Sequence, residues 1–229
     1  SAPLTVTAGG LTVQGRGLSS FGGASLDIDS ASSISGMVNI IGGRLRLDNL
    51  NSALGAPTAI NISGSGSSRG TNLTRGLEIW NTTVNRIGDS TEINLNGGRI
   101  MMISTSAAAE TVGTLNLTGG ASSIYTFLFN GVGNTNNLTF GALGARAKGA
   151  TLHFDDSGLG TAGNSRVAFS GLGTGFIGGW ATVGNEFATY ASDSVTALSS
   201  YSSTFASDTN VRPTVSGAIN SFVINSLNL

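Results

Sequence analysis

The chain has 229 residues and a formal net charge of −1, and only 10% of its positions are charged, so its polar surface comes mainly from Ser, Thr and Asn. Its 11 Lys and Arg residues are scattered, which excludes a basic patch for nucleic acid or anionic lipid. It has no Cys for disulfides or thiolate metal sites, and no apolar run approaches the ~18 residues that span a bilayer. We therefore expect no nucleic-acid partner and no membrane insertion.

Apolar and polar residues alternate in short runs along the whole chain, which is the pattern of β-strands. Helical periodicity is hard to find, and the only segment with some helical character, STSAAAETVGTL (104–115), has few enough alanines to form a loop. The sequence therefore predicts an all-β protein in which residues 1–229 form a single domain. The clearest strands are expected at 4–13, 25–29, 93–103, 114–120, 137–143 and 151–156.

Pairs of glycines follow strand-like residues at four places. Their second members are 33, 55 and 22 residues apart, all multiples of eleven, which suits a repeating coil of about 22 residues. A Gly-Gly pair forms either a hairpin turn or a corner between successive strands of a coil. The sequence makes little use of Asn-Gly and Asp-Gly turns and has only 3 prolines, which favours the coil. About ten coils would make a rod roughly 45 to 50 Å long. The pairs are Gly9-Gly10, Gly42-Gly43, Gly97-Gly98 and Gly119-Gly120.

Inward-pointing aliphatic residues of such a coil stack in columns and supply most of its stability. We expect Leu45 and Leu47 to stack with Ile93 and Leu95. The same inward role is expected of Leu115, Leu117, Leu138 and Phe140, and the outward, water-facing positions are Arg44, Arg46, Asn94, Asn116 and Thr139.

Several segments resemble the autotransporter-associated β-strand repeat proteins of bacteria. The most specific is GGWATVGNEFATYASDSVTAL (178–198), and the others are VNIIGGRLRLDN (38–49), ALGAPTAINI (53–62) and AINSFVINSLNL (218–229). The resemblance implies a right-handed parallel β-helix, or β-solenoid, that is secreted and displayed at the cell surface as a segment of a longer passenger. It brings no common catalytic residues. The chain shows no C-terminal membrane barrel, so we expect a passenger piece, a processed product or a stand-alone relative.

Sites for catalysis, metals and cofactors find little support in the residue pattern. His153 shares a strand face with Asp155, as a general base and its orienting carboxylate would, but a surface histidine is favoured. The acids fall singly or in short pairs, so a calcium-dependent polysaccharide lyase is only a third alternative. GGASLDID (22–29) half-matches a calcium-binding nonapeptide, and GTGFIG (173–178) matches a nucleotide-binding loop without the helix that should follow it. We predict no catalytic residue, no metal and no cofactor. The acid pairs are Asp27 with Asp29 and Asp155 with Asp156.

Two sets of residues are candidates for contacts with sugars or partners. Seven aromatic residues lie between 169 and 205, and within this aromatic-rich block (167–205) Trp180, Phe187 and Tyr190 are candidates for an interface or for stacking on glycans. The alternative is that they fill the interior of a wider coil. Five N-x-S/T triplets are glycan acceptors in a secreted protein, although outward, inward, outward strand positions built from Asn and Thr produce the same pattern. The triplets begin at Asn61, Asn72, Asn81, Asn116 and Asn137.

Both ends of the chain are strand-patterned and neither has the sequence of a cap. The exposed edge of one copy can then pair with the next, which gives an open filament. We expect the stacking strands to contain Leu4, Val6, Val223, Leu227 and Leu229. The leading hypothesis is a non-enzymatic extracellular protein that forms a surface fibre or stalk by head-to-tail self-association. The alternative is an adhesin or glycan-binding segment, whose partners would be surface glycans.

Overall fold

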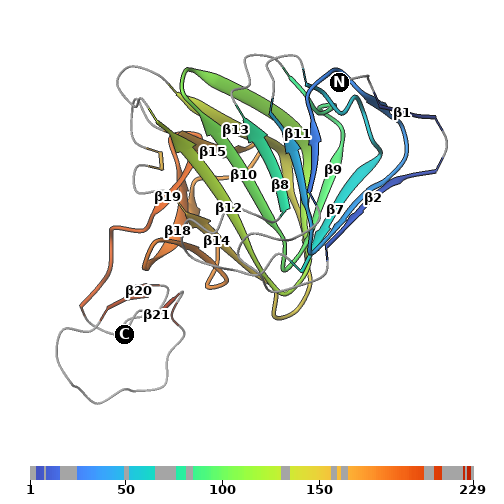
Figure 1. Ribbon diagram of the computed structural model, residues 1–229. Helices are drawn as coiled ribbons and strands as arrows, with labels where there is room; N and C mark the ends of the chain where they lie inside the picture. The colour runs from blue at the N-terminus through green and yellow to red at the C-terminus, as the bar shows by residue number, and fades with distance from the viewer. Residues whose placement is uncertain are drawn as a thin grey trace.

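The computed structural model of the chain is built from β-strands (Figure 1). The described residues are 4–7, 9–15, 25–48, 52–64, 76–80, 85–129, 135–155, 159–160, 165–203, 209–212, 224 and 226–227. All regular elements within these ranges are strands. The described residues contain no helix long and apolar enough to cross a membrane. The all-β prediction is confirmed.

Two sheets contain most of the strands. The seven-stranded sheet consists, in spatial order, of β15 (Ser165–Phe169), β13 (Asn136–Arg146), β11 (Ala108–Gly119), β9 (Glu92–Asn96), β7 (Ala59–Ser63), β5 (Val38–Ile41) and β2 (Leu11–Gln14). The ten-stranded sheet contains β16 (Gly175–Phe176), β18 (Glu186–Ala191), β17 (Ala181–Val183), β14 (Thr151–Asp155), β12 (Ala121–Leu128), β10 (Arg99–Ser104), β8 (Gly76–Trp80), β6 (Arg44–Leu47) and β3 (Ser25–Ile28), with β19 (Ser194–Ala197) paired to β18. Two small sheets pair β1 (Thr5–Val6) with β4 (Ser33–Ile34) and β20 (Asn210–Val211) with β21 (Ser226–Leu227).

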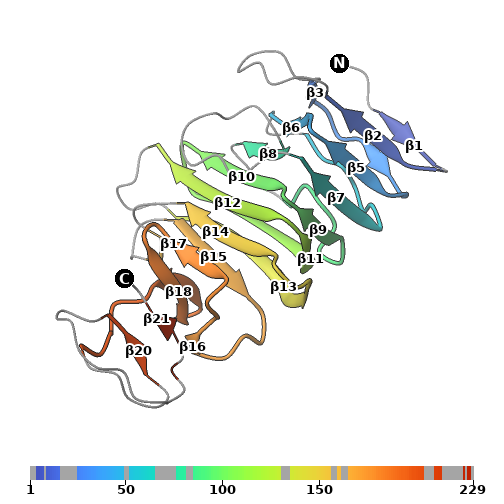
Figure 2. The ribbon, with the colours of Figure 1, turned by 90° about the horizontal axis from the view of Figure 1, so that it is seen from below.

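From β5 to β15, successive strands alternate strictly between the two large sheets. Each strand pairs in parallel with the equivalent strand of the next level, where a level is one strand from each sheet (Figure 2). Register is strict, with Ile60 opposite Val38 on one side and opposite Ile93 on the other. Parallel sheets of this kind form when like residues of successive levels lie over one another.

The glycine pairs are corners between the sheets. Gly42-Gly43 joins β5 to β6, and Gly97-Gly98 joins β9 to β10, and in each case the two strands belong to different sheets. Gly42 has a φ of 62° and Gly97 a φ of 64°, a left-handed conformation that glycine adopts without steric cost. A Cβ atom on Gly98 would lie 2.4 Å from the carbonyl oxygen of Ile62, so the corner also excludes a side chain. The corner interpretation of Gly-Gly, rather than the hairpin, is the one that fits.

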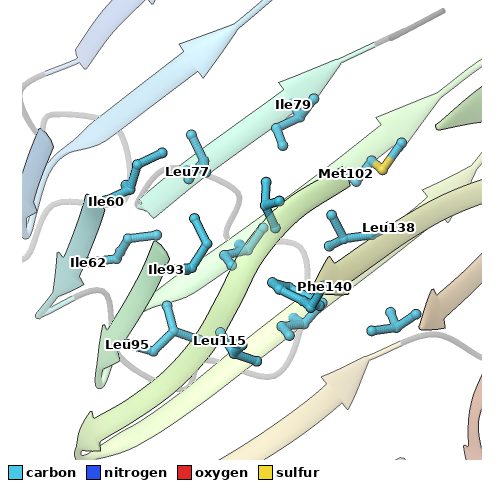
Figure 3. Close-up of a cluster of buried hydrophobic side chains, with 14 of the residues drawn as sticks. Ile60, Ile62, Leu77, Ile79, Ile93, Leu95, Met102, Leu115, Leu138 and Phe140 are labelled. Carbon is cyan, nitrogen blue, oxygen red and sulfur yellow. The ribbon is translucent and has the colours of Figure 1, made fainter. Parts of the chain in front are cut away.

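Inward residues of both sheets form continuous columns (Figure 3). All eight aliphatic and aromatic positions expected to point inward are at most 1% exposed. The expected partners of Leu45 were wrong, because Leu45 belongs to the ten-stranded sheet and Ile93 to the seven-stranded sheet. One column of the seven-stranded sheet is Val13, Ile40, Ile62, Leu95 and Leu117, and one of the ten-stranded sheet is Leu26, Leu45, Leu77, Ile100, Ile124, Phe154 and Val183.

A third, shorter ladder is present at the N-terminal levels, in addition to the two large sheets. β1 pairs with β4, and isolated parallel bridges join Ala31 to Ala53 and Gly55 to Ile87. Backbone hydrogen bonds continue this ladder from Leu54 N to the carbonyl oxygen of Arg86 at 2.8 Å. The levels containing these residues therefore have three hydrogen-bonded sides.

β11 (Ala108–Gly119) is the longest of the described strands. Its first part lies in the segment 104–115, where the sequence suggested a loop, and its last part lies in the strand expected at 114–120. β11 pairs in parallel with β9 on one side and β13 on the other. Its alternation places Glu110 and Val112 in the interior. The alanines that begin the strand have weak β-propensity, and their pairing with β13, from Ala108 opposite Asn136 onward, outweighs it.

Residues 175–197 depart from the parallel pattern. β17 is parallel to β14 but antiparallel to β18, and β18 is antiparallel to β16 and β19. Two-residue turns reverse the chain, at Gly184-Asn185 with a φ of 58° at Gly184 and at Ser192-Asp193 with φ values of 50° and 54°. Positive φ in such turns matches the twist of the flanking strands of a hairpin. We call residues 175–197 the hairpin block.

Truncation of one inward isoleucine tests whether the columns carry the stability. Ile62 is 1% exposed within its column, and Ile62→Ala should lower the free energy of unfolding by about 2 to 5 kcal/mol because it leaves a cavity. Ile41, on the neighbouring strand and 42% exposed, is the matched control, and Ile41→Ala should change stability by at most about 0.5 kcal/mol. Urea denaturation measures both. Equal losses in the two variants would contradict the columns as the main source of stability.

Candidate functional site

Charged residues gather on the outer face of the ten-stranded sheet, over β3, β6 and β8. Arg44 Nη2 lies 3.1 Å from Asp27 Oδ1, and its Nη1 lies 3.7 Å from Glu78 Oε2. Arg46 Nε lies 3.9 Å from the same Glu78 oxygen, and the guanidinium of Arg46 covers the ring of Trp80 at 4.4 Å. We call these five residues the arginine–carboxylate cluster. It brings two arginines and two carboxylates together in a chain with few charged residues.

Glu78 is the most buried member of the arginine–carboxylate cluster, at 1% exposure. Burial raises the pKa of its carboxyl group, and the nearby charge of Arg44 opposes that rise only in part. The indole of Trp80 also donates a hydrogen bond from Nε1 to Glu78 Oε2 at 3.3 Å. The Glu78 carboxylate thus links β8 to β6, and Arg44 links β6 in turn to Asp27 of β3.

Arg44 and Arg46 were expected to face water, but their side chains are only 22% exposed. The signal for the cluster was in the sequence: Arg-x-Arg at 44–46 and Glu-x-Trp at 78–80 each place two such residues on one strand face. What the sequence lacked was the pairing of 44–47 with 76–79, which brings Arg46 opposite Glu78.

Aromatic rings continue along the same face beyond the cluster. Trp80 and Phe129 have ring centroids 6.4 Å apart, Phe129 and Phe127 4.8 Å, and Phe127 and Tyr125 5.9 Å. Arg99 lies over Tyr125 at 5.4 Å. Only Phe129 among these rings is largely exposed, at 55%. Most of this strip therefore packs against itself, as a hydrophobic layer on the outside of the sheet.

His153 lies farther along this face, on β14. As predicted, it alternates with buried residues, and its Nδ1 shares a hydrogen bond with Thr182 Oγ1 at 2.9 Å. A hollow of about 280 Å³ opens beside it, walled by Trp180. Asp155 is on the same strand face, next to Tyr125 of β12, and Asp156 lies outside the described residues.

Tyr190 closes the last level of the seven-stranded sheet. Its hydroxyl group accepts a hydrogen bond from Phe169 N at 3.1 Å and donates one to Phe169 O at 3.0 Å. These are backbone groups on the outer edge of β15, the last strand of that sheet. Arg166 of the same strand donates to the carbonyl oxygens of Ser192 and Asp193 in the hairpin block, each at 3.0 Å. The hairpin block therefore covers the edge of β15 and acts as a cap, which the sequence did not reveal.

The three aromatic residues predicted for an interface have different surroundings. Tyr190 is 4% exposed and belongs to the interior, where its ring lies 6.5 Å from that of Phe169. Phe187 is half-buried and makes an edge contact with Phe176 at 5.8 Å. Trp180 is half-buried beside Arg146, whose guanidinium is 5.2 Å from the ring. Trp180 borders the hollow beside His153, and Tyr190 borders another hollow, of about 450 Å³, at the end of β15.

Four asparagines form a ladder along the outer face of the seven-stranded sheet. Asn61 donates from Nδ2 to Asn39 Oδ1 at 2.8 Å, Asn94 to Asn61 at 2.9 Å, and Asn116 to Asn94 at 3.0 Å. The members are 22, 33 and 22 residues apart, which are multiples of eleven like the glycine spacings. The ladder joins successive levels through side chains as well as backbone.

The asparagine ladder bears on the predicted glycan acceptors. Asn61 and Asn116 are half-buried and use Nδ2, the atom that would carry a sugar, to hold their neighbours. Asn137 Nδ2 donates to Thr135 Oγ1 at 3.4 Å. Asn72 and Asn81 lie outside the described residues. Glycosylation stays a prediction. The ladder gives Asn61 and Asn116 a structural role.

The two sequence motifs, the half-match to a calcium-binding nonapeptide at 22–29 and the GxGxxG segment at 173–178, lie in different local structures. In the half-match to a calcium nonapeptide, residues 22–24 lie outside the described residues, and Asp27 is held by Arg44 and by Ser25 Oγ at 2.8 Å. Within the described part of the chain, no group of three His, Cys, Asp or Glu residues comes together as metal ligands would. The GxGxxG segment 173–178 contains β16 and is followed by a turn and β17.

The predicted stacking residues are only partly described. Leu4 and Val6, at the N-terminal levels, are half-buried and pack against the core. Leu227 is in β21, which pairs with β20, and Val223 and Leu229 lie outside the described residues. At the N-terminal end, β2 and β3 each pair with one strand only within the described ranges.

A buried charged pair holds the corner near the third ladder. Glu110 accepts hydrogen bonds from Arg86 N and Ile87 N, the latter at 2.9 Å, and Arg86 Nη1 donates to Leu47 O at 2.9 Å and Ser52 Oγ at 3.1 Å. Both charged residues are 1% exposed. Burial raises the pKa of Glu110 to about 7, despite the two backbone hydrogen bonds and the charge of Arg86.

No protein-family model matches the chain, and no curated protein and no solved structure is similar to it. The resemblance to autotransporter-associated repeats therefore stays a prediction from the residues. Function has to be argued from the sheets, the cap and the polar groups described above.

Removal of the Tyr190 hydroxyl group tests the cap. Tyr190→Phe leaves the N–H and C=O of Phe169 without their partner, which should lower the free energy of unfolding by about 1 to 3 kcal/mol. Amide hydrogen exchange should accelerate at Phe169. The amide of Phe140, on the neighbouring interior strand β13, is the internal control and should keep its protection. Unchanged exchange at Phe169 would show that Tyr190 does not close this edge.

The Glu110 carboxyl group predicts a pH dependence of stability. Because its pKa is about 7 in the folded chain and near 4.5 when unfolded, the folded state binds the proton more tightly. Stability from this group is therefore complete below about pH 4.5 and falls as the pH rises to about 7, by about 2 to 3 kcal/mol. Glu110→Gln should remove this loss in urea denaturation at pH 4.5 and 7.5. Thr111→Ala, which removes no titratable group, should retain it, and an identical pH profile for wild type and Glu110→Gln would contradict the assignment.

Proposed function

We propose that this chain is a non-enzymatic extracellular structural protein, a β-solenoid that serves as a subunit of a cell-surface fibre or stalk. The observation that carries the proposal is the set of continuous columns that run through parallel levels of both large sheets. Such a body is an extended scaffold whose length grows by adding levels.

The finer fold that we propose is a right-handed parallel β-helix. Alternation of strands between two parallel sheets, with a third ladder at the N-terminal levels, supports a coil over a pair of independent sheets. Connections between parallel strands of one sheet are almost always right-handed, which supports the handedness. Seven strands at about 4.8 Å give the seven-stranded sheet a span of about 29 Å, shorter than the ten coils expected, because the hairpin block replaces the last levels.

Self-association is proposed to proceed head to tail. β2 and β3 offer an edge at the N-terminal end, and β19 is an outer strand at the opposite end of the ten-stranded sheet. The edge of β15 is not the receiving surface in this arrangement, because Tyr190 and Arg166 already engage it. A contact between different ends of successive copies produces an open filament. Extracellular location is supported by the resemblance of the residues to secreted repeat proteins.

A proline in the edge strand tests this proposal. Leu11 N donates to the carbonyl oxygen of Met37, the residue before β5, so the N–H of Thr12 points to the opposite, open side of β2. Thr12→Pro removes that donor and should abolish filaments while leaving the pairing with β5 in place. Thr12→Ala keeps the donor and should assemble like the wild type.

Negative-stain microscopy and sedimentation velocity over a range of protein concentrations are the measurements. Filaments of the wild type and of Thr12→Ala, with short rods of Thr12→Pro, are the expected outcome. Monodisperse short rods of the wild type at high concentration, or closed dimers that grow no further, would rule out head-to-tail assembly.

A further inference from the structure

A hollow lies on the outer face of the ten-stranded sheet, across β12, β14 and β17. Its floor includes outward residues of these strands, with His153 of β14 paired with Thr182 of β17. Trp180 forms one wall, and the volume is about 280 Å³. Small residues keep the space open. The lining that matters here is Ala121, Thr151, His153, Gly179, Trp180 and Thr182.

The indole of Trp180 is held in place from two sides. The guanidinium of Arg146 lies 5.2 Å from its ring, and Arg146 Nη1 is itself fixed by the carbonyl oxygen of Ala150 at 3.0 Å. A Cβ atom at Gly178 would be 2.4 Å from Trp180 Nε1, so only glycine lets the indole fold back over this point. An aromatic wall that is fixed before a ligand arrives loses little entropy on binding.

The polar side chains that line the hollow are the hydroxyl groups of serine and threonine and the imidazole of His153. Thr182 Oγ1 and His153 Nδ1 are 2.9 Å apart, so the imidazole is oriented by the threonine hydroxyl. Thr151 is exposed at the rim. Hydroxyl groups both donate and accept hydrogen bonds, which matches a ligand whose edge is a row of hydroxyls. Apart from His153, no lining residue is ionisable.

We propose that this hollow binds one pyranose ring of a neutral glycan, with an apolar face of the sugar stacked on Trp180 and its hydroxyl groups at Thr151, His153 and Thr182. A sugar ring combines an apolar face with a polar edge, which is the combination that this site offers. The volume is just below the range of about 300 to 1,000 Å³ for drug-sized ligands, so the site takes a single ring. This function is distinct from self-association, because the hollow lies on the outer face of the sheet and its lining belongs to neither β2 and β3 nor β19.

Saturation-transfer NMR on the full chain tests the proposal, with the methyl glycosides of glucose, galactose and N-acetylglucosamine as probes. We expect transfer to ring protons of at least one glycoside, with a loss of at least about fivefold in Trp180→Ala. Because that variant also loses the Arg146 contact, a second variant, Ala121→Leu, fills the hollow from an exposed position and should give the same loss. Phe129→Ala, at an exposed aromatic residue outside the hollow, should bind like the wild type.

Circular dichroism and thermal unfolding establish that each variant is folded before binding is compared. Absence of transfer to all three glycosides in the wild type would overturn the proposal. Transfer to adenosine but to none of the glycosides would also overturn it, since the indole would then be a platform for flat aromatic rings. Equal signals from the wild type and Ala121→Leu would place sugar binding outside this hollow.

Discussion

The structure depends on one constraint, the parallel pairing of each strand with its equivalent in the next level. Parallel register places like positions over one another, so a residue that points inward in one level must be followed by an inward residue in the next. The column from Val13 through Ile62 to Leu117 satisfies this requirement at each step. Charge contributes little to holding the levels together, because few positions carry it.

The same constraint explains the polar outer surface. A residue such as Asn94 is placed between Asn61 and Asn116 by the pairing that stacks the interior, and its amide both donates and accepts along the sheet. On the other sheet, the register that places Leu45 over Leu77 also sets Arg46 beside Glu78. Buried polar groups are tolerated only where they have partners, and repetition supplies these partners.

The sequence predicted the strands, their inward residues and the glycine corners, because alternation and Gly-Gly pairs are local signals. It did not predict which strands are neighbours, so Leu45 was matched with Ile93 and Arg46 was placed in water. The cap was missed for a different reason. Gly184-Asn185 and Ser192-Asp193 are turn sequences, but nothing local shows that Tyr190 meets the backbone of Phe169. The partner of Leu45, the surroundings of Arg46 and the contact of Tyr190 with Phe169 all depend on long-range pairing. Residue spacing alone does not encode that pairing.

The unequal sequence spacing of the asparagine ladder indicates how the number of residues per level can vary. Asn61 and Asn94 are 33 residues apart, whereas the neighbouring steps are 22, yet the amide contacts are equally short. Extra residues can therefore enter at the circumference without altering the pitch along the axis.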